Sequence, residues 1–111
     1  MTPLYDFAYV WGGAFLTNAL PHAVAGLQGK PFQTPFARPP GQGLSTSRTN
    51  AIWGGANVVV AWLLLAKVGA FDIRSSEHFA AALAGGLLLA VAMAHHFGRF
   101  NGGNAAAQKS A

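Results

Sequence analysis

The sequence contains no cysteine among its 111 residues, and only three of those residues are acidic. Without cysteine the chain offers no disulfide, no thiolate nucleophile and no Cys-ligated metal or iron–sulfur cluster. Charged residues of both signs make up only 9% of the chain, and no acidic residue falls inside the apolar segments 7–27, 51–71 and 79–97. This scarcity of carboxylates argues against carboxylate-based proton pumping.

Hydrophobic residues, by contrast, make up 52% of the chain. Residues 79–97 form a run of nineteen without Lys, Arg, Asp or Glu, close to the roughly 20 residues that a helix needs to cross a bilayer. We therefore predict an all-α integral membrane protein with three transmembrane helices, at about residues 7–27, 51–71 and 76–97. These helices form a single domain over residues 1–100, and a flexible C-terminal tail follows at residues 101–111.

The connection between the first two predicted helices, residues 28–50, is long and rich in proline. It holds four of the six prolines of the chain, and proline is poorly tolerated inside a helix because it lacks a backbone donor. We predict a loop here, with Phe32, Phe36 and Arg38 suited to docking on a partner. Thr49 or Asn50 is predicted to cap the second helix, and Ser75 the third.

The placement of basic residues predicts an orientation. Lys30, Arg38 and Arg48 lie in the first connection, and Arg99 and Lys109 follow the last apolar run, whereas basic and acidic residues balance in the second connection. Positive charge in short loops favours the cytoplasmic side. We expect a multi-pass protein of the bacterial inner membrane with its N-terminus outside, and with loop 28–50 and the C-terminus in the cytoplasm.

Polar residues inside the predicted spans form the candidate site. Asn18 and His22 are four residues apart and share one helix face, and Asn57 lies at a comparable depth in the second span. His95 and His96 are placed at the cytoplasmic boundary of the third. We expect these five residues to form a buried polar cluster beneath the basic loop.

Two interpretations of this cluster stay open. In the first, the side chains make hydrogen bonds between helices and have a structural role. In the second, an ionisable residue within the membrane marks function, and His22 carries protons or binds haem with His95 or His96 as the second ligand. The sequence has no CxxCH motif and no pair of histidines at i, i+4 spacing.

Small residues recur at helical spacing and predict close helix packing. Each predicted span carries one pair of adjacent glycines, and glycine pairs also admit a flat ligand such as a quinone, a carotenoid or a chlorin. The residues predicted to pack between helices are Gly54, Ala82, Gly86, Ala90 and Ala94.

Four short strings resemble a family of small multi-pass bacterial membrane proteins without an assigned function. They are Asn18-x-x-Pro21-His22, Gly29-Lys30-Pro31-Phe32-x-Thr34-Pro35-Phe36, Pro39-Pro40-Gly41-x-Gly43 and Asn50-x-x-Trp53-Gly54-x-x-Asn57. The resemblance covers the first half of the chain and implies residence in the bacterial inner membrane. Its residues are the polar ones of the spans and the loop.

We expect a non-catalytic membrane subunit, because the sequence carries no catalytic constellation. Its partners are the lipid bilayer and other membrane subunits or copies of itself, and no nucleic acid is expected. A homo-oligomeric channel or transporter is the first alternative, and a protein that binds haem, quinone or a pigment is the second. In the main interpretation the chain needs neither a cofactor nor a metal.

Overall fold

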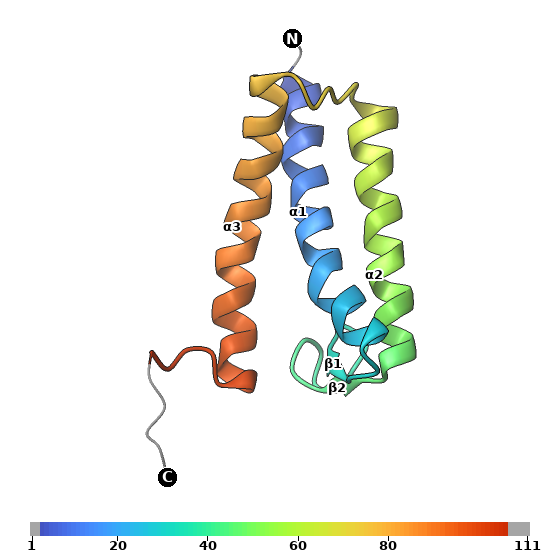
Figure 1. Ribbon diagram of the computed structural model, residues 1–111, viewed down its shortest axis with the longest axis vertical. Coiled ribbons are helices and arrows are strands. Elements are labelled where there is room, and N and C mark those ends of the chain that lie inside the picture. The colour runs from blue at the N-terminus through green and yellow to red at the C-terminus, as the bar shows by residue number, and fades with distance from the viewer. Residues whose placement is uncertain (1–2, 107–111) are drawn as a thin grey trace.

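The computed structural model describes residues 3–106, which fold mainly into three long helices (Figure 1). Helix α1 spans Pro3–Leu27, and α2 spans Ser47–Trp62 and continues directly as the π-helical segment η1 (Leu63–Val68). Helix α3 spans Ser76–Asn101, and strands β1 (Phe32–Gln33) and β2 (Leu44–Ser45) pair antiparallel in the first loop. The predicted all-α class is confirmed. Residues 107–111 of the predicted tail lie outside the described residues.

Helix α1 occupies the centre of the arrangement. It packs along both α2 and α3, which lie on either side of it and are thereby kept apart (Figure 1). Helix α1 runs antiparallel to α2 and parallel to α3 (Figure 1), and the molecule is elongated, with principal extents of 54 × 30 × 23 Å. The hairpin of β1 and β2 therefore closes the end of the molecule at which α1 finishes and α2 begins.

Four helix ends differ from the predicted bounds. Helix α1 begins at Pro3 instead of residue 7, and η1 ends at Val68 instead of residue 71. Helix α2 begins at Ser47 because Thr46, not Thr49 or Asn50, is its N-cap, and the Thr46 hydroxyl accepts from the Thr49 backbone N–H at 3.2 Å. Ser75 caps α3 as predicted. Helix α3 then continues past residue 97 to Asn101, where Gly102 adopts a left-handed conformation (φ 83°) that suits a helix C-cap.

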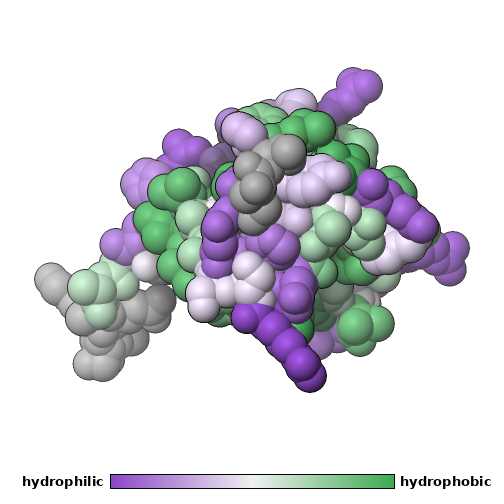
Figure 2. Space-filling view, turned by 90° about the horizontal axis from the view of Figure 1, so that it is seen from above, coloured by the Kyte–Doolittle hydropathy of each residue, from purple (hydrophilic) through white to green (hydrophobic). Residues whose placement is uncertain are grey.

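Two helical segments are long and apolar enough to cross a membrane. They are the continuous helix Ser47–Val68 and helix α3, and large apolar side chains such as Ile52, Leu88 and Val91 stand exposed on them. Helix α1 has 25 residues but does not reach the same hydropathy. Figure 2 looks down on the end of the molecule opposite the hairpin and shows hydrophilic side chains both over the middle of this view and at its edges, with hydrophobic ones between them.

Glycines allow the backbones of α1 and α3 to approach closely. A Cβ at Gly13 would overlap the backbone of Ala82, and one at Gly85 would overlap the carbonyl group of Val10. Such close approach lets helices pack through van der Waals contact, which drives association in lipid. Gly13, Gly85 and Gly86 therefore lie in the contact surface between α1 and α3, whereas Gly12 faces Leu65 of η1.

At the opposite end from the hairpin, Tyr9 anchors the link between η1 and α3. Its side chain is completely buried and its hydroxyl accepts from the backbone N–H of Ala70 at 2.9 Å. The Tyr9 ring also packs against the rings of Phe71 and His78, with centroid distances of 5.6 and 4.5 Å. Tyr9 thus ties the connection to the middle helix.

The glycine contact generates a matched pair of variants. Gly85→Ala places a methyl group against the Val10 carbonyl, and overpacking of this kind costs about 1 to 3 kcal/mol. Gly55→Ala adds the same group where nothing lies within 4 Å, so the better helix propensity of alanine makes it neutral or stabilising. Thermal unfolding in detergent measures both, and equal melting temperatures would contradict the proposed contact.

Candidate functional site

The polar residues of α1 and α2 meet in a buried network near the hairpin. Asn18 Nδ2 donates to Asn57 Oδ1 at 2.9 Å, and Asn57 Nδ2 donates to the backbone carbonyl of Trp53 at 2.8 Å. His22 and Asn50 lie within hydrogen-bond distance, with 2.7 Å between Nδ1 and Oδ1. His22, Asn50 and Asn57 are each no more than 2% exposed. The helices are thus joined by two polar contacts.

Asn50 connects this network to the loop. Its Nδ2 lies 3.2 Å from the carbonyl oxygens of Phe32 and Ser45 and 3.0 Å from that of Thr46. An amide nitrogen donates and an amide oxygen accepts, so the oxygen of Asn50 faces His22. In the neutral ring, His22 Nδ1 must therefore carry the proton and donate it to Asn50, which leaves Nε2 as an acceptor.

The loop folds back on itself before it reaches α2. The hydroxyl groups of Thr34 and Ser45 bond each other across the β1–β2 pair, and the Thr34 carbonyl accepts from the backbone N–H of Gly41 at 2.8 Å. Gly41 has a φ of 72°, a conformation that favours glycine. The loop is therefore an ordered cap over the polar network.

The C-terminal part of α3 holds this cap from the other side. The Arg99 guanidinium donates to His96 Nδ1 at 2.8 Å, so His96 Nε2 carries a proton and donates to the Gly41 carbonyl at 2.7 Å. Asn101 Nδ2 donates to Gln33 Oε1 at 3.1 Å. His96 thus binds the loop and not His22.

The remaining predicted residues occupy different surroundings. His95 is exposed, and its backbone carbonyl accepts from Asn104. Phe32 packs inward on Phe97 with a ring-centroid distance of 4.7 Å, whereas Phe36 and Arg38 are exposed. Of the docking set, only Phe36 and Arg38 therefore lie open at the surface.

The residues predicted to pack between helices also differ in their surroundings. A Cβ at Gly54 would press on Ala23 of α1, Ala82 meets Gly13, and Gly86 lies against Thr17. Ala90 is half-buried and Ala94 is exposed. Helix α3 packs on α1 mainly through its first half.

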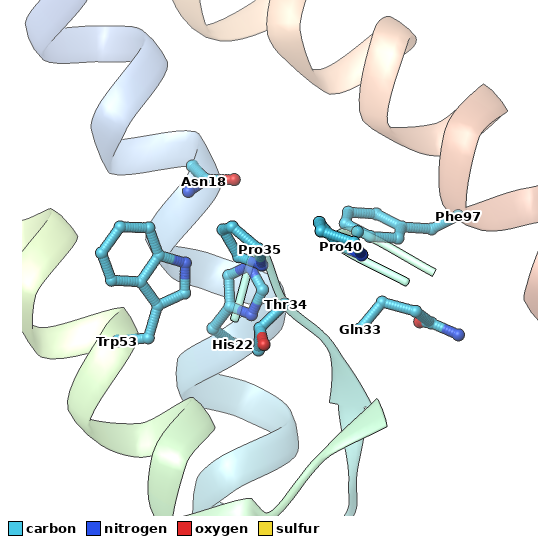
Figure 3. A pocket seen from close by; sticks show the side chains of 9 residues that line it. Asn18, His22, Gln33, Thr34, Pro35, Pro40, Trp53 and Phe97 are labelled. Carbon is cyan, nitrogen blue, oxygen red and sulfur yellow. The ribbon is translucent and has the colours of Figure 1, made fainter. Parts of the chain in front are cut away.

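A cavity of about 310 Å³ lies between the network and the loop (Figure 3). No Lys, Arg, Asp or Glu lines it. The indole nitrogen of Trp53, one of the lining side chains, is buried and has no hydrogen-bond partner among residues 3–106. The lining residues are Asn18, His22, Gln33, Thr34, Pro35, Pro40, Gly41, Trp53 and Phe97.

Asn50 and Trp53 are site residues of α2 that the predicted cluster omits, and the cavity-lining residues of the loop and Phe97 are also absent from it. Asn50 lies seven residues before Asn57, on the same helix face, so its spacing could have included it. No sequence signal distinguishes Trp53 from an ordinary interfacial aromatic residue. Within residues 3–106, no three His, Asp or Glu side chains gather in a way that could hold a metal ion.

Comparison with known proteins finds no matching family model, curated protein or solved structure.

The contact between His22 and Asn50 can be measured by a double-mutant cycle. His22→Leu leaves the amide oxygen of Asn50 without its donor, and an unsatisfied buried group costs about 1 to 3 kcal/mol. In an Asn50→Leu background the same substitution should cost less, since the acceptor is gone. Unfolding free energies of the four proteins give the coupling. A coupling of zero would contradict the assigned hydrogen bond.

Proposed function

We propose that this chain is a small, non-catalytic membrane protein that crosses the bilayer three times and packs on another membrane subunit. That subunit belongs to a larger complex or is a second copy of the chain. The proposal has two parts, insertion in the bilayer and association within it.

Insertion is supported by the relation of α1 to its neighbours. Helix Ser47–Val68 and helix α3 have the length and hydropathy of membrane spans, and α1 packs along both. A helix of 25 residues is about 37 Å long at 1.5 Å per residue, and the hydrocarbon core is about 30 Å thick. If α2 and α3 cross the bilayer, α1 lies at the same depth, with its polar residues turned inward.

Association is supported by a single observation, the groove that remains because α2 and α3 do not meet. This groove has a volume of about 420 Å³ and is apolar except for Thr17. Its floor is α1, with Leu16 and Leu20 at 46% and 60% exposure, and one wall is α3, where Leu87 is 55% exposed. Gly13, Gly86 and Ala90 also line it.

Such a groove suits the side of a partner helix. Between helices in lipid the hydrophobic effect supplies no driving force, so association depends on shape and on small residues that let backbones approach. Asn18 is bonded to Asn57, and His22 is bonded to Asn50, whose amide also bonds the loop. A structural role for them agrees with a subunit that contributes packing and not chemistry.

The proposed location is the bacterial inner membrane, with the hairpin end in the cytoplasm. Lys30, Arg38 and Arg48 lie in or beside the loop at that end, and Arg99 near the end of α3 lies there too. At the other end, Arg74 follows Asp72, whose carboxylate accepts from the Arg74 backbone N–H at 2.9 Å. The excess of positive charge therefore marks the hairpin end.

Single-cysteine labelling tests this orientation on the cysteine-free background. Gln42→Cys and Arg74→Cys place thiols at exposed positions at opposite ends of the molecule. In intact cells a membrane-impermeant maleimide should label the residue at position 74 and leave position 42 unlabelled until the cells are permeabilised. The reverse pattern would overturn the proposed topology.

Native mass measurement in mild detergent tests association. The expected particle is heavier than the single 11.5 kDa chain, and mass spectrometry of its components separates a second copy from a different subunit. Leu20→Ala combined with Leu87→Ala removes groove volume and should release the single chain. Ile52→Ala combined with Val91→Ala is the matched control, because both side chains are exposed but do not line the groove. A wild-type particle of one chain alone would contradict the proposal.

A further inference from the structure

The cavity under the loop contains polar groups that the protein itself does not satisfy. His22 is 2% exposed, and its Nδ1 is engaged by Asn50. Its Nε2 has no hydrogen-bond partner among residues 3–106, although His22 lines the cavity. In the tautomer fixed by Asn50 this nitrogen is an acceptor. Nε2 is therefore available to accept a hydrogen bond from a molecule that enters the cavity.

Two more unpaired groups line the same space. Trp53 Nε1–H is a buried donor without a partner, and Figure 3 shows this nitrogen on the edge of the indole turned toward Asn18 and His22. Asn18 donates through Nδ2 to Asn57, and its amide oxygen points away from Trp53 in the same view. The cavity therefore presents one buried donor without a partner, Trp53 Nε1–H, beside two acceptor atoms that make no bond within residues 3–106, His22 Nε2 and Asn18 Oδ1.

The rest of the lining specifies a neutral, flat occupant. Pro35, Pro40 and Phe97 supply apolar walls, and no charged side chain lines the space. At about 310 Å³ the cavity is at the lower end of ligand pockets, which span about 300 to 1,000 Å³. This volume suits a single ring, and aromatic lining residues favour ring stacking or edge contacts.

We infer that this cavity binds the head of a neutral single-ring aromatic alcohol with an apolar tail, a phenol or a quinol. A ring hydroxyl donates to His22 Nε2, and Trp53 Nε1–H donates to an oxygen of the same ligand. A quinone, which carries only acceptors, leaves His22 and Asn18 unpaired and binds less well. The inference does not depend on the partner subunit proposed above.

Binding of 4-decylphenol to the full chain in detergent tests the inference, with decylbenzene as the ligand that lacks only the hydroxyl. Ligand concentrations are expressed as mole fraction in the detergent phase, which corrects for partition. One lost hydrogen bond corresponds to about fivefold in affinity, so the phenol should bind at least fivefold tighter. In ¹⁵N-indole spectra the Trp53 resonance should shift downfield with the phenol, while those of Trp11 and Trp62 stay in place.

Variants separate the site from general partition. Trp53→Phe keeps an aromatic ring beside Phe36 but removes the unpaired donor together with part of the indole ring system, so the protein should fold and bind the phenol about fivefold more weakly. Trp62→Phe changes an exposed ring outside the cavity and should leave affinity unchanged. Equal affinities for phenol and decylbenzene, or equal shifts of all three indoles, would overturn the inference and leave a cavity that holds water or lipid.

Titrations of decylhydroquinone and decylbenzoquinone in the absence of oxygen distinguish a simple phenol from a quinol as the ligand that carries the hydroxyl. If the hydroquinone binds more tightly than 4-decylphenol, the second hydroxyl is recognised and the natural ligand is a quinol. If the two bind equally, the ligand is a simple phenol. In either case the quinone should bind at least fivefold more weakly than the hydroquinone. A quinone that binds more tightly would contradict the assigned tautomer of His22 and with it the inference.

Discussion

The amide of Asn50 is the contact on which the hairpin end of this molecule depends. Its nitrogen reaches three backbone carbonyls, of which Phe32 is in β1 and Ser45 is in β2, while its oxygen accepts from His22 of α1. In the low dielectric of a protein interior these bonds are strong, and an unpaired member is costly. One side chain therefore fixes the loop, the start of α2 and the tautomer of His22 together.

The position of the loop in turn creates the cavity. Asn50 holds β1 over His22. As a result, the loop residues Pro35, Pro40 and Gly41 form a wall that faces α1 and α2. Helix α3 adds a further wall through Phe97, and its bonds from His96 to Gly41 and from Asn101 to Gln33 keep it against the loop. The unpaired nitrogens of His22 and Trp53 follow from this arrangement, since no loop residue reaches them.

The sequence predicts the helices well and the loop poorly, for physical reasons. Apolar runs and Ser75 locate the helices, because hydropathy and capping are local properties. The start of α2 was misplaced because several Ser and Thr residues precede Asn50, and only the bond from Thr49 N–H to Thr46 identifies the cap. The loop contacts join residues 55 and 68 positions apart, as in His96–Gly41 and Asn101–Gln33, and no local pattern encodes such pairs. Helix periodicity is a local pattern, and it predicts the clustering of Asn18, His22 and Asn57. It does not predict that His95 and His96 lie apart from them.

One short stretch of α1 contributes to both the groove and the cavity, through different faces of the helix. Leu16, Thr17 and Leu20 face the groove, whereas Asn18 and His22 face the cavity. Helical periodicity makes this separation possible, since residues two apart point in different directions. The bond from Asn18 to Asn57 holds α1 against α2, so it sets the rotation of α1 and thereby the direction of both faces.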